Sequence, residues 1–120
     1  MKNNILTIII ILVCNISSVA QEKMSVTEMA DYQTQQMVKE LNLTTEQTEK
    51  VKIINLKYTE KIVVLMESTG SMFGKIGEMN EIKKGKLSEL EKVLSQEQLE
   101  KYEHDVAPNI KKHMRKNMKL

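Results

Sequence analysis

The stretch Leu43-Thr44-Thr45-Glu46-Gln47 recurs as Leu94-Ser95-Gln96-Glu97-Gln98, and each copy has the pattern of a helix start. In both copies a leucine precedes a hydroxyl residue, and a glutamine stands three positions after that hydroxyl. The hydroxyl can accept a hydrogen bond from the first helical turn, while a side chain three positions on can bond back to the cap. We therefore predict two helix-capping motifs, made of Leu43, Thr44, Gln47, Leu94, Ser95 and Gln98.

Apolar residues repeat at helical spacing on both sides of these motifs. In residues 45–67 they recur every three or four positions, at Val51, Ile54, Tyr58, Ile62 and Leu65. A capping box at Ser25 predicts an earlier helix to about Leu41, and a further helix is expected from about Glu78 to Leu94. Residues 68–77 hold three of the four glycines and predict the chain reversal. The fold class that follows is all-α, with three to four helices in a thin helical hairpin or bundle.

The composition favours solvated helices over a thick core. The 120 residues include one Phe, three Tyr and no Trp, so few large side chains are available for burial. The 18 Lys and Arg nearly balance the 16 Asp and Glu, as long solvated helices require. No Ser/His/Asp grouping or phosphate-binding glycine loop is evident. We expect a protein that is not an enzyme and uses no cofactor.

Residues 1–20 have the three-part layout of a secretory signal peptide. A short basic start is followed by an aliphatic run from Ile5 to Val13, and Ser18-Val19-Ala20 places small residues before Gln21. A membrane-spanning helix would need about 20 apolar residues, more than this run provides. Cleavage would remove Cys14, the only cysteine. We expect a secreted chain with a helical domain over residues 21–107 and a tail over residues 108–120.

The tail is strongly basic. It carries no acid and five basic side chains: Lys111, Lys112, Arg115, Lys116 and Lys119. Two interpretations stay open, a frayed soluble end and a basic amphipathic helix that docks on an anionic membrane or an acidic protein. The tail has no interleaved aromatic residues for base stacking, so we expect no nucleic-acid partner.

Metal binding is not indicated. The only imidazoles are His104 and His113, nine positions apart on either side of Pro108. No His-x3-His pair exists, and Met114 and Met118 beside His113 are a weak pattern for Cu(I). We predict no metal site.

The two pentads, in a small helical chain with a leader and no remaining cysteine, resemble the Spy/CpxP-like family of periplasmic proteins. That family is named for its LTxxQ motif, and the resemblance covers roughly residues 25–107. It implies a thin antiparallel dimer in the periplasm that acts without ATP as a chaperone for unfolded envelope proteins. CpxP-like relatives also restrain an envelope-stress sensor kinase.

For this sequence the resemblance implies a chaperone or envelope-stress binding protein with an apolar and cationic surface. The alternative is a regulatory adaptor whose basic tail docks on a sensor domain or an anionic membrane. Met72, Phe73 and Ile76, expected to pack back from the glycine-rich turn, supply apolar candidates. The full set of candidate client- or partner-binding residues is Met72, Phe73, Ile76, Lys83, Lys84, Lys86, Lys111, Lys112, Arg115 and Lys116.

Overall fold

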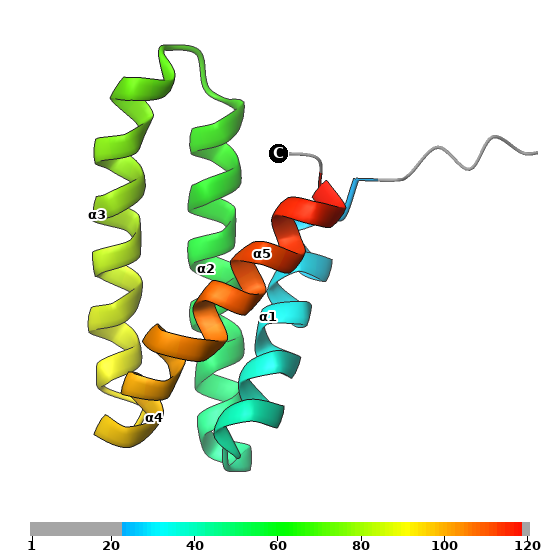
Figure 1. The fold of residues 1–120 in the computed structure, drawn as a ribbon, viewed down its shortest axis with the longest axis vertical. Coiled ribbons are helices and arrows are strands. Elements are labelled where there is room, and N and C mark those ends of the chain that lie inside the picture. The colour runs from blue at the N-terminus through cyan, green and yellow to red at the C-terminus, as the bar shows by residue number, and fades with distance from the viewer. Residues whose placement is uncertain (1–22, 119–120) are drawn as a thin grey trace, which may run out of the picture.

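The computed structural model describes residues 23–118, and every regular element in that range is helical (Figure 1). The elements are α1 (Val26–Leu41), α2 (Thr45–Glu67), α3 (Met72–Glu91), α4 (Gln96–Lys101), the π-helical turn η2 (Tyr102–Val106) and α5 (Ala107–Met118). The last three run on without a break, and we call them the rod. The all-α expectation of three to four helices is confirmed. The expected leader, residues 1–20, lies outside the described residues.

Both pentads start helices, α2 and α4. The Thr44 hydroxyl accepts from the Gln47 backbone N–H at 3.1 Å, and Gln47 Oε1 accepts from the Thr44 N–H at 3.1 Å. Ser95 and Gln98 exchange the equivalent bonds at 3.1 and 3.0 Å. Each exchange satisfies backbone groups that a helix end otherwise leaves unpaired. Because a cap depends only on neighbouring residues, these starts are fixed locally.

The third helix begins earlier than the glycine pattern predicts. α3 starts at Met72 and not near Glu78, so the reversal is confined to residues 68–71. The Ser71 hydroxyl caps it by accepting from the Gly74 N–H at 3.3 Å. Helical geometry then points Phe73 into solvent, where it is 87% exposed. The expectation that Met72, Phe73 and Ile76 pack back onto the helices is wrong, since all three are exposed.

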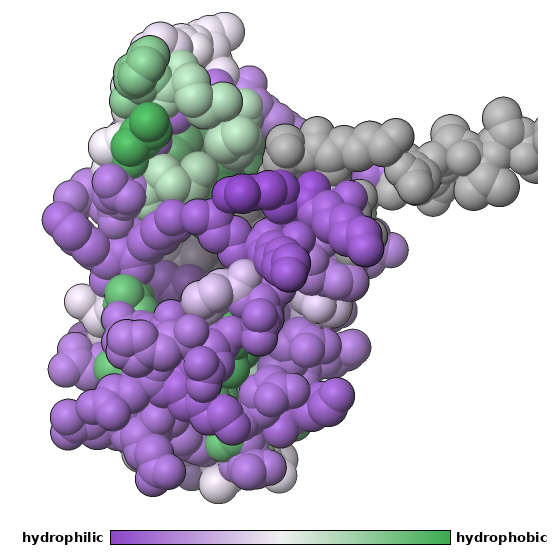
Figure 2. All heavy atoms as spheres, in the orientation of Figure 1, coloured by the Kyte–Doolittle hydropathy of each residue, from purple (hydrophilic) through white to green (hydrophobic). Residues whose placement is uncertain are grey.

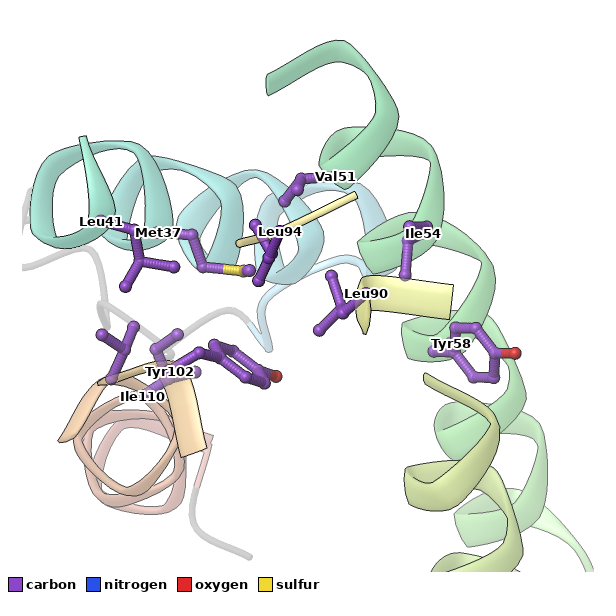
Figure 3. Packing of buried hydrophobic residues seen from close by; sticks show 10 residues of the cluster. Met37, Leu41, Val51, Ile54, Tyr58, Leu90, Leu94, Tyr102 and Ile110 are labelled. Atoms are coloured by element: carbon purple, nitrogen blue, oxygen red, sulfur yellow. The ribbon is translucent and has the colours of Figure 1, made fainter. Parts of the chain in front are cut away.

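The hydrophobic core lies where α1, α2, α3 and the rod meet (Figure 3). Figure 3 shows Tyr102 and Ile110 of the rod facing Met37 and Leu41 of α1. The buried cluster consists of Met37, Leu41, Val51, Ile54, Tyr58, Leu90, Leu94, Tyr102, Val106 and Ile110. The tip-side half of the hairpin extends beyond this core (Figure 1).

Pro108 lies inside the rod instead of ending a helix. Proline has no N–H, so the ordinary helical bond to the carbonyl four residues earlier cannot form. Just before it, the Ala107 N–H donates to the Tyr102 carbonyl, five residues back, which is a π-helical bond. The rod therefore continues through Pro108, and the basic tail is helical as far as Met118.

The rod is anchored on α1 by its apolar face. Ile110 is buried in the core, and Met114 packs against it. The ring of His113 stacks on Tyr32 of α1, with 4.4 Å between ring centroids. These contacts fix α5 in place beside the hairpin, so its basic residues have defined positions.

Candidate functional site

An apolar groove of about 860 Å³ opens between the tip-side half of the hairpin and the rod. α2 and α3 contribute apolar side chains to it that lie outside the buried core cluster, Ile62, Val63, Met66 and Met79 among them. Its apolar lining comes from α1, α2, α3 and the rod, and consists of Met29, Ile62, Val63, Met66, Met79, Leu87, Tyr102, Ala107, Pro108, Ile110 and Met114.

A second hollow extends the groove toward the hairpin tip. It has a volume of about 160 Å³ and shares Met66, Met79 and Lys83 with the groove. Its remaining lining includes Met72 and Ile76, two of the apolar residues predicted to bind clients. Figure 2 shows hydrophobic side chains gathered over this end of the hairpin, above a band of hydrophilic side chains over α5. The two hollows therefore form one apolar path with a polar border.

Basic side chains outnumber acidic ones along the groove. The basic lining residues are Lys23, Lys83, Lys86, Lys111 and Arg115, and the acidic ones are Glu67 and Glu103. Lys23 Nζ lies 3.7 Å from Glu67 Oε1. Within residues 23–118, the other four cations form no ion pair. The groove therefore favours anionic partners.

Lys86 is the least exposed of the basic residues that line the groove. Its Nζ donates to Gln33 Oε1 at 2.7 Å, and Gln33 Nε2 in turn donates to Thr59 Oγ1 at 2.9 Å. The Nζ also lies 5.9 Å from the centre of the Tyr102 ring. Burial disfavours the charged form and lowers the pKa of Lys86 to about 8. The side chain is therefore still mainly charged at neutral pH.

Tyr102 forms the wall of the groove beside Lys86. Burial, with a smaller effect from the Glu103 carboxylate, raises the pKa of Tyr102 to about 12. The phenol therefore stays neutral at physiological pH and presents an apolar ring to the groove.

The structure brings together part of the predicted binding set. Lys83, Lys86, Lys111 and Arg115 line the groove, while Met72 and Ile76 line the adjoining hollow. The others lie elsewhere: Phe73 projects into solvent, Lys84 pairs with Glu81 at 3.2 Å, and Lys112 and Lys116 are exposed outside the groove. The capping residues Leu43, Thr44, Gln47, Leu94, Ser95 and Gln98 lie at the opposite end of the hairpin from its tip.

Residues 17–102 match a protein family described as a domain of unknown function, DUF4890. The chain belongs to the DUF4890 family. No curated protein and no solved structure matches it. In this DUF4890 domain the matched range contains both pentads and the groove residues Lys83 and Lys86, whereas Lys111 and Arg115 come after it.

Two further features concern the described part of the DUF4890 chain. Residues 23–118 contain no cluster of three or more His, Cys, Asp or Glu able to hold a metal ion. Over the same residues, no helix combines the length and the apolar character needed to cross a membrane.

Sequence reasoning missed Gln33 and Thr59, the two polar residues bonded to each other beneath Lys86. A signal was present, because Gln33 stands four residues from both Met29 and Met37 on the buried face of α1. A polar residue inside an apolar stripe requires a partner when it is buried. That rule identifies Gln33, although it does not identify its partner.

Proposed function

We propose that this protein is a periplasmic chaperone or envelope-stress binding protein that holds unfolded clients without ATP. The observation that carries the proposal is the apolar groove with its excess of basic side chains. Unfolded chains expose apolar side chains, and burying these in a groove is favourable by about 25 cal/mol per Å². Acidic segments of a client would be attracted by the basic border.

The methionines of the groove support a client that varies in sequence. Met29, Met66, Met79 and Met114 all line it. Methionine is unbranched and polarizable, so it repacks against differently shaped partners more easily than branched side chains do. A groove of this composition suits broad and weak binding better than recognition of one rigid surface.

The pentads and the leader support the cellular setting. Leu43-Thr44-Thr45-Glu46-Gln47 and its second copy resemble the LTxxQ motif of the Spy/CpxP-like periplasmic family, and residues 1–20 resemble a secretory signal peptide. The proposed activity is binding, with no catalytic step, and its proposed partners are unfolded or partly folded envelope proteins.

The outer face of α2 supports self-association as an antiparallel dimer. Ile53 and Val64 are 69% and 68% exposed and lie on one side of the helix, with Glu60 between them. A twofold axis near residues 58 and 59 would set Ile53 against Val64 of the second copy. Exposed apolar patches of this kind mark interfaces. Sedimentation at tens of micromolar should give a dimer mass that Ile53→Lys reduces, and a monomeric wild type would contradict the dimer.

The test of client holding is light scattering from a client that unfolds in the presence of the purified protein, without nucleotide. The wild type should suppress aggregation, and Lys83→Glu with Arg115→Glu should weaken suppression because both side chains line the groove. Lys112→Glu with Lys116→Glu is the matched control, since these changes have the same charge and lie outside it. Wild-type protein that leaves aggregation unchanged would refute the chaperone proposal.

The exposed outer face of α5 favours a second candidate, a regulatory adaptor. Lys112 and Lys116 lie one turn apart on this helix and are free to meet a sensor domain or an anionic membrane. If this candidate holds, the control pair of changes abolishes binding to that surface while the groove pair does not. The two outcomes are opposite, so one set of variants separates the two functions.

A further inference from the structure

Lys86 is a half-buried cation of the groove lining and has no carboxylate partner. Among residues 23–118, no Asp or Glu oxygen lies within ion-pair distance of its Nζ. An ammonium has three donors. One of them bonds the neutral Gln33 side chain, and the ammonium also lies over the face of the Tyr102 ring.

The position of Lys86 in the sequence makes this cation costly. It lies four residues after Ile82 and four before Leu90. Leu90 is part of the core, and Ile82 packs against it. An apolar residue would therefore suit the same face of α3. A charge that is removed from water without a counter-charge lowers stability. Binding of an anion at Lys86 would relieve that cost.

We propose that the groove binds a single-chain anionic amphiphile, with a terminal carboxylate on Lys86 and an alkyl chain along the methionine-lined path toward the hairpin tip. The proposal does not depend on client holding. It assigns to the groove a small-molecule ligand of the fatty-acid class.

The dimensions of the groove agree with such a ligand. Its volume of about 860 Å³ lies within the range of about 300–1,000 Å³ that is usual for small-molecule sites. From Lys86 the path passes Lys83 and Met79 to Met72 at the start of α3. Lys86 lies 14 positions after Met72, which corresponds to roughly 21 Å along the helix. The path is thus long and mainly apolar, with the half-buried Lys86 ammonium at one end and the exposed Lys83 along it.

The polarity of the lining favours an alkyl chain over a buried peptide backbone. Gln33 and Thr59, polar residues of the lining, are already hydrogen-bonded. A peptide laid deep in the groove would leave backbone N–H and C=O groups unpaired, at a cost of about 1–3 kcal/mol each. An alkyl chain has no such groups to satisfy. A client would then bind with side chains in the groove and its backbone near the rim.

Isothermal titration of the purified protein with dodecanoate, below its micelle-forming concentration, tests the proposal. The wild type should bind one dodecanoate per chain, and dodecanol, which has the same tail without the charge, should bind about tenfold more weakly. Lys86→Met should also weaken dodecanoate binding about tenfold and leave dodecanol binding unchanged. Lys84→Met, which removes a neighbouring lysine outside the groove, should bind dodecanoate as the wild type does.

Met79→Glu provides a second variant that does not alter Lys86. The new carboxylate would lie on the path of the alkyl chain and should weaken dodecanoate binding. No binding to the wild type, equal binding of dodecanol and dodecanoate, or full binding by Lys86→Met would each overturn the proposal. Client holding is measured separately by light scattering, so either proposal can fail while the other stands.

Discussion

The side-chain amides of Gln47 and Gln98 hydrogen-bond to each other, although 51 residues separate them in the sequence. Gln47 Nε2 donates to Gln98 Oε1 at 2.8 Å, and Gln98 Nε2 donates to Gln47 Oε1 at 3.3 Å. Gln47 also donates to the Val93 carbonyl and Gln98 to the Leu41 carbonyl, both at 3.1 Å. The two pentads are therefore one structural unit, which ties the start of α2 to the start of α4.

This pairing predicts that the two glutamines are energetically coupled. Gln47→Ala or Gln98→Ala should each lower the free energy of unfolding by about 1–3 kcal/mol, because each leaves part-buried polar groups unpaired. The double variant should lose less than the sum, by about 1 kcal/mol. Urea denaturation of all four proteins measures the coupling. Gln96→Ala is the control, since its side chain is exposed and bonds only within α4. Strictly additive losses would contradict the pairing.

Two glycines of α3 should respond differently to replacement by alanine. A Cβ at Gly77 would meet nothing within 4 Å, whereas a Cβ at Gly85 would lie 3.1 Å from the Tyr58 hydroxyl oxygen. Gly77→Ala should therefore stabilise the protein by about 1 kcal/mol, the usual helix-propensity gain. Gly85→Ala should gain much less, because the Tyr58 ring must move. Thermal denaturation compares the two, and equal gains would show that Tyr58 does not pack closely on Gly85.

Stability should rise with pH because of Lys86. Its pKa is 10.5 ordinarily and about 8 in the folded chain, so between these values the unfolded chain binds a proton that the folded chain does not. The free energy of unfolding should increase by about 1–2 kcal/mol from pH 7.5 to 9.5. Above pH 10 the free energy of unfolding should fall because of Tyr102. Its pKa is about 12 in the folded chain, so the folded chain keeps a proton that the unfolded chain loses.

Urea titrations at pH 7.5 and 9.5 measure this effect. Lys86→Met should be more stable than the wild type at pH 7.5. Its free energy of unfolding should then increase less than that of the wild type between pH 7.5 and 9.5. Lys84→Met, exposed on the same helix, should keep the wild-type rise. A rise of the same size in Lys86→Met and in the wild type would show that Lys86 is not its source.

Local chemistry explains which parts of the fold were predictable. The caps at Ser25, Thr44 and Ser95 depend on residues three positions away, so the sequence indicates where α1, α2 and α4 begin. The predicted start of α3 near Glu78 is wrong because the cap at Ser71 begins the helix ahead of Gly74 and Gly77. Each glycine weakens a helix by about 1 kcal/mol without ending it.

The groove was less predictable because it depends on how the rod lies against the hairpin. That arrangement is set by long-range contacts such as Ile110 in the core and His113 on Tyr32, and by the π-helical turn before Pro108. The cluster of lysines in α3 was visible in the sequence, but charge alone does not separate the half-buried Lys86 from its exposed neighbour Lys84. The two lysines differ in their position on the helix, because Lys86 shares a face with Ile82 and Leu90.

Photo-crosslinking from the groove tests the central claim, that unfolded clients bind there, most directly. A photo-crosslinking amino acid would replace Met79, which lines both hollows, or Glu91, which is exposed at the far end of the same helix. With a client that is unfolding, we predict a strong crosslink from position 79 and little from position 91. Equal crosslinking from the two positions, or none from position 79, would contradict the claim.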